Sequence, residues 1–229
     1  MSSLNIAARP WLMPHKPSLD WPLLLVALGL ASFGVIMVAS ASIDFAAQVY
    51  GDPWYFVKRH LIFLLLAIVC GFLVYSLPVA VWNRSAILLL LAGVGLLAAV
   101  LIPGVGKSVN GAQRWIRVPG ISTFQMVEAV KILYLVWLAS YLVRFRDDVN
   151  ATWGAMLKPI GVATLLVILL LAQPDFGSAT MLLAVTAGML VLGGGHLKRM
   201  MLPVLLLLPA LVAVAVIEPY RLRRITSFW

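Results

Sequence analysis

Two charged residues stand three positions apart in an otherwise apolar stretch of this sequence. Glu128 and Lys131 occur in QMVEAVKILYLVWL, residues 125–138. Residues three apart share one face of a helix, so the carboxylate and the ammonium can form an ion pair. An unpaired charge in lipid costs about 2.5 to 3.5 kcal/mol, so we expect the pair to face protein or a water-filled cavity. It is a candidate functional site; an ion pair that fastens two helices is the alternative.

A second candidate is Gly106-Lys107-Ser108, which has the ending of a nucleotide-binding phosphate loop. That loop needs a glycine five positions before its Gly-Lys pair, and Leu101 stands there. It also needs a preceding strand and a following helix whose amino end faces the phosphates, and the sequence predicts neither. We therefore reject a nucleotide site at this segment.

Basic residues cluster before two apolar runs: Lys58 and Arg59 before one, Arg114 before another. Long basic side chains often reach the membrane interface from such positions. A cavity built from several of them could hold a pyrophosphate, because guanidinium groups bind phosphate oxygens in bidentate fashion. The segment Gln173-Pro174-Asp175 interrupts a further apolar run. It marks either a ligand cavity between broken helices or a tight turn in which Asp175 caps the next helix.

Composition indicates that these residues belong to a membrane protein. The 229 residues are 63% hydrophobic and 11% charged, with a mean hydropathy of +1.04. The apolar runs suit membrane-spanning helices, so the fold class is all-α, a polytopic helical bundle. The single cysteine, Cys70, excludes an intramolecular disulfide or a cysteine-based metal cluster. A net charge of +9 favours anionic lipid or a lipid-linked anionic substrate over nucleic acid.

Seven spans are predicted after a basic tail over residues 1–20. They are Trp21 to Ser42, Leu61 to Val81, Ala86 to Ile102, Phe124 to Val143, Ile160 to Ala172, Phe176 to Leu192 and Met201 to Ile217. The fifth is too short to cross unless its helix starts near Trp153 and Lys158 reaches the interface. Lys and Arg divide almost evenly between the two faces, so the positive-inside rule does not decide the orientation.

Four motifs, NGAQRWI, FQMVEAVKI, AQPDFGSA and EPYRLRRITSFW, follow one another in an order and spacing that resemble the SEDS peptidoglycan glycosyltransferases. The last motif is most similar to the cell-division members. The resemblance implies a bundle of about ten spans, seven of them here, with residues 21–229 forming the SEDS membrane domain. It also implies the bacterial inner membrane at the division septum, with a cytoplasmic amino terminus.

The resemblance further implies a function. Family members polymerise lipid II into glycan strands and release undecaprenyl pyrophosphate lipid; a lipid II flippase is the alternative. Expected partners are a class B penicillin-binding transpeptidase and the FtsQ, FtsL and FtsB proteins, with no nucleic acid. No cofactor is certain, although a divalent cation, Mg²⁺ or Mn²⁺, would suit the leaving pyrophosphate.

By resemblance, Glu128 and Lys131 match the family's Glu-x-x-Lys pair, which is regarded as important for activity, although Met126 and Val127 replace the usual proline and small residue. Arg59 matches an arginine of the family's substrate cavity, and Arg114 matches the arginine of its Asn-Gly-x-x-Arg-Trp motif. Substrate binding is therefore expected at Arg59, Arg114, Glu128 and Lys131, with secondary candidates Lys58, Gln173, Asp175 and Arg221.

The catalytic residue itself is unknown from this sequence. The resemblance places an aspartate in a large outer loop after the seventh span, which would lie beyond Trp229. We therefore expect this chain to be the amino-terminal part of a longer protein, and to be inactive alone. Asp175 matches the aspartate of the family's Gln-Pro-Asp motif, a different position, and Ser178 replaces the threonine common there.

Overall fold

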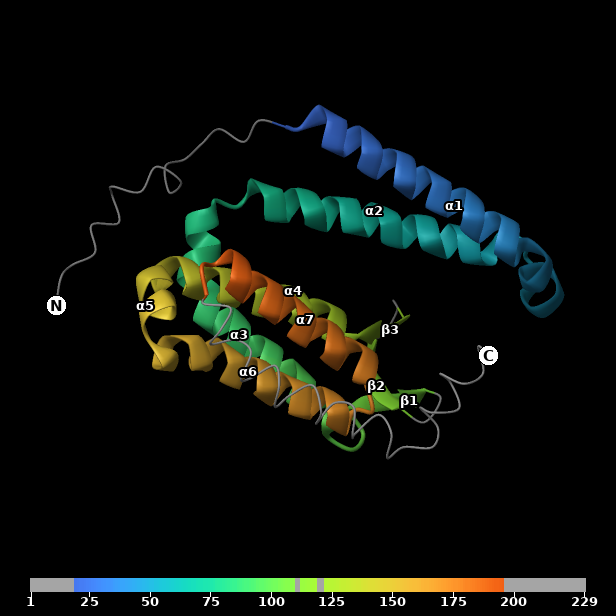
Figure 1. Cartoon of the computed structure of the whole chain (residues 1–229). Coiled ribbons are helices and arrows are strands. Elements are labelled where there is room, and N and C mark those ends of the chain that lie inside the picture. The colour runs from blue at the N-terminus through green and yellow to red at the C-terminus, as the bar shows by residue number, and fades with distance from the viewer. Residues whose placement is uncertain (1–18, 110–111, 119–121, 196–229) are drawn as a thin grey trace, which may run out of the picture. The chain divides into compact units, whose positions relative to one another are not determined.

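A computed structural model describes residues 19–109, 112–118 and 122–195 of the chain. Within these ranges the chain forms helices and one small sheet (Figure 1). The helices are α1 Trp21–Tyr50, α2 Tyr55–Ser76, α3 Val79–Leu101, α4 Met126–Arg144, α5 Arg146–Ala151, α6 Trp153–Ala172 and α7 Phe176–Leu192. The chain divides into two compact units, residues 1–82 and 83–229, and each is described by itself.

The first unit contains the hairpin of α1 and α2, whose two helices pack against each other. Asp20 caps α1 by accepting a hydrogen bond from the Leu23 amide at 3.1 Å. The helix continues to Tyr50, eight residues beyond the predicted end at Ser42, and stops at Gly51, which takes the left-handed conformation with φ 68°. A glycine in this conformation is a common helix terminator, because it has no Cβ to oppose the turn.

The starts of α2 and α3 differ from the sequence prediction for a common reason. We expected α2 from Leu61 and α3 from Ala86, yet they begin at Tyr55 and Val79. The polar residues that precede the apolar runs are helical too, because a helix can continue where its end leaves the hydrocarbon. The predicted ends of these spans, Val81 and Ile102, also move, to Ser76 and Leu101.

The fifth predicted span is the longer helix that starts near Trp153, rather than the short one from Ile160. Its helix, α6, starts at Trp153, where Thr152 accepts a hydrogen bond from the Ala155 amide at 3.4 Å. Twenty residues reach about 30 Å, which matches the hydrocarbon core. Five described helices are long and apolar enough to cross a membrane: α1, α2, α3, α4 and α6. The shorter α7 has 17 residues, and the predicted span Met201 to Ile217 lies outside the described residues.

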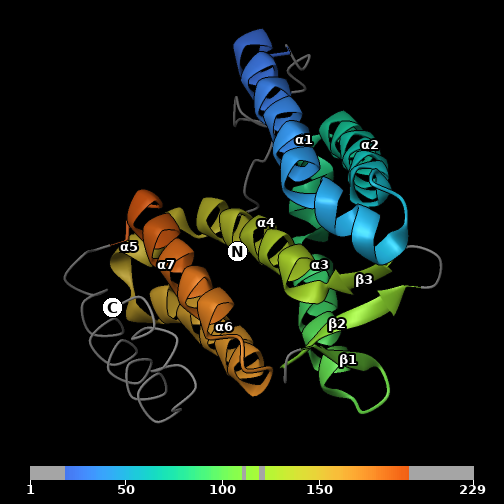
Figure 2. The same ribbon diagram turned by 90° about the vertical axis from the view of Figure 1, so that its right-hand side faces the viewer.

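The second unit packs its core around α4, α6 and α7. Figure 2 shows α7 between α4 and α6, and it contacts both. The α4 residues Tyr134 and Leu138 are at most 1% exposed, as are Leu166 and Leu170 of α6. The short helix α5 joins α4 to α6, and Val149 anchors it with no exposed surface. Hydrophobic burial thus fixes the helices that carry the candidate residues.

A three-stranded antiparallel sheet lies between α3 and α4, where the sequence predicted no strands. Its strands are β1 Gly106–Val109, β2 Ala112–Val118 and β3 Ser122–Gln125, in the order β1-β2-β3. The central residue Trp115 pairs with Lys107 of β1 and Gln125 of β3. Strand β3 leads directly into α4 at Met126, so the predicted helix start at Phe124 falls in the strand.

Candidate functional site

Glu128 and Lys131 form the predicted ion pair at the start of α4. Their side chains meet with Lys131 Nζ 2.8 Å from Glu128 Oε1. The two differ in surroundings, because the Lys131 side chain is 18% exposed and that of Glu128 is 57% exposed. The expectation that the pair faces a protein interior therefore holds for Lys131, while Glu128 faces outward from the second unit.

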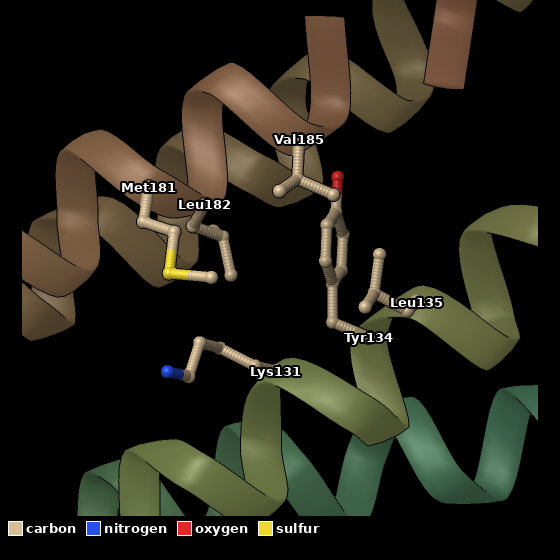
Figure 3. Close-up of a pocket in the computed structure, with 6 residues that line it drawn as sticks. All are labelled: Lys131, Tyr134, Leu135, Met181, Leu182 and Val185. Carbon is tan, nitrogen blue, oxygen red and sulfur yellow. The ribbon is translucent and has the colours of Figure 1, made fainter. Parts of the chain in front are cut away.

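Lys131 lies beside a small cavity between α4 and α7 (Figure 3). The cavity has a volume of about 40 Å³, enough for a few water molecules. The α4 side is formed by Lys131, Tyr134 and Leu135, and the α7 side by Met181, Leu182 and Val185. Lys131 extends along the cavity toward Met181, with its amine at one side (Figure 3). The ammonium thus stands at the edge of an apolar space, where charge interacts more strongly than in water.

A buried hydrogen bond joins the two helices one turn along from Lys131. The Tyr134 hydroxyl lies 2.9 Å from Thr186 Oγ1. Thr186 donates its own proton to the Leu182 carbonyl at 2.6 Å, so Tyr134 is the donor to Thr186. Sequence reasoning missed this contact, although Tyr134 is three residues after Lys131 and shares its helical face.

Arg114 of β2 contacts the turn between α6 and α7. Its Nε donates to the Gln173 carbonyl at 3.1 Å, and its Nη2 donates to the Pro174 carbonyl. Its Nη1 lies 3.6 Å from Asp175 Oδ1, an ion pair in which the Asp175 side chain is 7% exposed. The structure thus brings the predicted residue Arg114 to two others, Gln173 and Asp175, that lie about 60 positions later in the sequence.

The turn itself is fixed from inside the bundle. Gln173 is 1% exposed and donates through Nε2 to the Leu97 carbonyl of α3 at 2.8 Å. Asp175 caps α7, as one reading of the sequence predicted, because Oδ1 accepts from the Ser178 amide at 3.2 Å and Oδ2 from the Ser178 hydroxyl at 2.8 Å. The break in the helices is therefore a well-bonded turn.

Lys58 and Arg59 belong to the first unit, near the turn between α1 and α2. Lys58 Nζ lies 2.8 Å from Asp52 Oδ2, and this hydrogen bond, with that from the Trp54 amide, lowers the pKa of the Asp52 carboxyl below its usual value. Arg59 donates through Nη1 to the Tyr55 hydroxyl at 3.2 Å, with its guanidinium carbon 6.0 Å from the Tyr55 ring centre.

Two further predictions concern Arg221 and a metal ion. Arg221 lies outside the described residues. Within residues 19–109, 112–118 and 122–195, no group of three or more His, Cys, Asp or Glu side chains lies close enough to hold a metal ion.

Comparison with known proteins identifies relatives over nearly the whole chain. Residues 20–229 match the family of FtsW, RodA and SpoVE, described as cell cycle proteins. A probable peptidoglycan glycosyltransferase FtsW from Xanthomonas oryzae is 56% identical over 90% of this chain and 41% of its own length. Another of that name, from Hahella chejuensis, is 41% identical over 100% of this chain and 57% of its own length. The chain thus spans about half the length of these relatives.

Two solved structures share the fold. The Thermus thermophilus rod shape determining protein RodA is 28% identical, with a TM-score of 0.60 over 82% of this chain and 58% of its own. A chain from a structure on the coordination of polymerization and crosslinking by a peptidoglycan synthase complex is also 28% identical, with a TM-score of 0.59 over 86% of this chain and 57% of its own. This multi-pass membrane chain therefore belongs to the SEDS family of FtsW, RodA and SpoVE.

Proposed function

We propose that the complete protein is a peptidoglycan glycosyltransferase that polymerises lipid II into glycan strands at the division septum. Support comes from the relatives, since the Xanthomonas oryzae and Hahella chejuensis proteins, which align with 90% and 100% of this chain, are each named probable peptidoglycan glycosyltransferase FtsW. The activity is assigned to the complete protein, in the bacterial inner membrane with the amino terminus in the cytoplasm.

The observation that carries the site is the placement of Lys131. Its ammonium is paired with Glu128 and stands beside an apolar cavity, with the side chain largely buried. A fixed positive charge in such surroundings stabilises developing negative charge strongly, because little water has to reorganise around it. The residues proposed for the substrate site are Arg59, Arg114, Glu128 and Lys131. Glu128 orients Lys131, and Arg59 is proposed on its own as a further phosphate contact from the first unit.

The proposed reaction is a displacement at the donor sugar. An acceptor hydroxyl oxygen forms a bond to the anomeric carbon of the donor, whose bond to the pyrophosphate oxygen breaks. The hydroxyl proton passes to a carboxylate, for which we propose an aspartate in the outer loop beyond Trp229. Lys131 would offset the charge that grows on the leaving undecaprenyl pyrophosphate, and a divalent cation could share this task.

Partners are proposed from the same relatives. A structural neighbour is a chain of a peptidoglycan synthase complex that couples polymerization and crosslinking. A glycan polymerase of this kind suits a class B penicillin-binding transpeptidase as partner, because one enzyme makes the strands that the other joins. FtsQ, FtsL and FtsB are proposed as further partners at the septum.

Replacing Lys131 tests the function and the site together. We expect Lys131→Ala to lower the rate of glycan polymerisation by about 100-fold or more, the loss typical of removing a group that stabilises charge in a transition state. The measurement is polymer formed from lipid II by the complete protein with its transpeptidase partner in proteoliposomes, together with the thermal unfolding midpoint of each variant.

The matched control is Lys158→Ala, which removes an exposed lysine from α6 of the same unit and should leave the rate unchanged. Lys131→Met keeps most of the packing volume without the charge and should lose activity as the alanine variant does. Wild-type rates in both Lys131 variants would remove this residue from the site. Lipid II flipping without polymer in the wild type would favour the flippase instead.

A further inference from the structure

The turn between α6 and α7 directs three acceptors at one guanidinium group. The carbonyl oxygens of Gln173 and Pro174 accept from Arg114 Nε and Nη2, and the Asp175 carboxylate lies beside Nη1. These contacts use all three nitrogens of Arg114. An anionic ligand that took the Nη1 edge would have to compete with a carboxylate that is almost fully buried.

The position of these acceptors explains why an arginine suits this turn. The last carbonyls of a helix lack partners within the helix, and α6 ends at Ala172, directly before Gln173. A cation there satisfies free carbonyls and opposes the negative end of the helix dipole. Arg114 therefore satisfies the carbonyls of the C-cap residue Gln173 and of Pro174 directly after α6, while its carboxylate partner Asp175 caps the start of α7.

The strand that carries Arg114 leads on to the lysine of the proposed site. Strand β2 pairs with β3 through Trp115 and Gln125, and Gln125 is followed directly by α4. Strand β2 also contacts α4. A shift of β2 away from the α6–α7 turn would therefore displace the first turns of α4, which hold Glu128 and Lys131.

We propose that Arg114 is a positioning residue of the substrate site, with Asp175 as its counter-ion. It fastens β2 to the α6–α7 turn and thereby sets the start of α4 and the place of the Lys131 ammonium. The charge that meets the ligand is then carried by Lys131, whose ammonium has one carboxylate partner on the same helix. This role rests on the proposed function, and it differs from direct binding of phosphate by Arg114.

The two roles predict opposite effects for Asp175→Asn. If Arg114 binds phosphate directly, removing its carboxylate partner frees the guanidinium, so the KM for lipid II stays the same or falls. If Arg114 is a positioning residue, then Asp175→Asn and Arg114→Gln both lower kcat. The double variant is then little worse than Arg114→Gln alone, because Arg114→Gln already removes the ion pair that Asp175→Asn breaks.

A measurement that needs no activity separates this inference from the proposed function. In the complete protein in nanodiscs, we expect Arg114→Gln to speed amide hydrogen exchange about tenfold or more over residues 112–118 and 122–131, as expected when several charged hydrogen bonds are lost. Asp175→Asn should give a smaller increase over the same residues. Arg114→Lys keeps the charge but not the planar guanidinium, so its exchange rate should lie between those of the wild type and Arg114→Gln. It replaces Arg114→Gln in the test if the glutamine variant does not fold.

The control is Lys107→Gln, which removes an exposed cation from β1 of the same sheet and should exchange as the wild type does. Unchanged exchange in the first turns of α4 in the Arg114 variants would overturn the inference, whatever the activity. So would a raised KM in Arg114→Gln with a normal or lower KM in Asp175→Asn. Faster exchange in a protein whose wild type forms no polymer would support the positioning role and reject the proposed function.

Discussion

Gly106, the first residue of β1, lies where the strand backbone leaves no room for a side chain. A Cβ added at this position would collide with the Val100 carbonyl oxygen and would lie 2.7 Å from two atoms of the Gln113 side chain. Gln113 Nε2 in turn lies 3.4 Å from the Ile102 carbonyl and 3.3 Å from that of Gly106. The backbone of β1 therefore packs directly on the end of α3.

We expect Gly106→Ala to destabilise the protein by about 1 to 3 kcal/mol, because the backbone must move to admit the methyl group. The measurement is the thermal unfolding midpoint in detergent. The matched control is Gly95→Ala in α3, where an added Cβ meets no atom within 4 Å and alanine is the better helix former. Equal midpoints for Gly106→Ala and the wild type would contradict this account of the β1 junction.

The candidate residues differ in how far sequence could predict their contacts. The pairing of Glu128 with Lys131 and the capping by Asp175 follow from local spacing, so both were predictable. The contact of Arg114 with Asp175 depends on the fold, because the two residues are 61 positions apart in the printed sequence. Nothing in the residue types alone distinguishes an arginine that binds a turn from one that binds phosphate.

At the scale of elements, helices were easier to predict than their ends. Apolar runs identify spans because lipid leaves the backbone few alternatives to a helix. The ends depend on caps such as Gly51 and Thr152, and on polar residues that remain helical beyond the hydrocarbon. The sheet was missed because its strands are only four to seven residues long, and because strand preference depends on packing context more than on residue type.

The contact between α4 and α7 can be tested through the buried hydrogen bond between Tyr134 and Thr186. We expect Tyr134→Phe to lower the free energy of unfolding by about 0.6 kcal/mol, and by no more than about 1.7 kcal/mol, the range found for such bonds in membranes. Unfolding by SDS titration measures the change. The loss is modest because Thr186 keeps its bond to the Leu182 carbonyl.

The matched control for this bond is Thr180→Val, since Thr180 donates to the Phe176 carbonyl within α7 and is exposed. Its stability should stay within about 0.5 kcal/mol of the wild type, as for most changes away from buried contacts. If Thr186→Val is combined with Tyr134→Phe, the losses should not add, because both remove the same bond. Additive losses would show that the two residues act separately.

At the scale of the whole molecule, the distribution of charge bears on orientation in the membrane. Lys and Arg lie near both ends of the spans, so their number does not identify the cytoplasmic face. Each span reverses the side of the membrane, however, so the order of the helices links the side of one turn to the side of every other. The 30 residues of α1 reach about 45 Å, so this helix extends beyond the hydrocarbon core of about 30 Å.

Cysteine labelling tests the proposed orientation, in which cations outside the membrane meet the pyrophosphate of a lipid. In a Cys70→Ala background, we expect Gln48→Cys at the end of α1 and Lys107→Cys in β1 to react with a membrane-impermeant maleimide added to intact spheroplasts. Asp147→Cys in α5 should react after permeabilisation alone, because an odd number of spans separates it from the other two. All three positions are exposed, so access depends on the side of the membrane. The reverse pattern would place Arg59 and Arg114 in the cytoplasm, away from an acceptor glycan outside the cell, and the proposed pyrophosphate site would then be wrong.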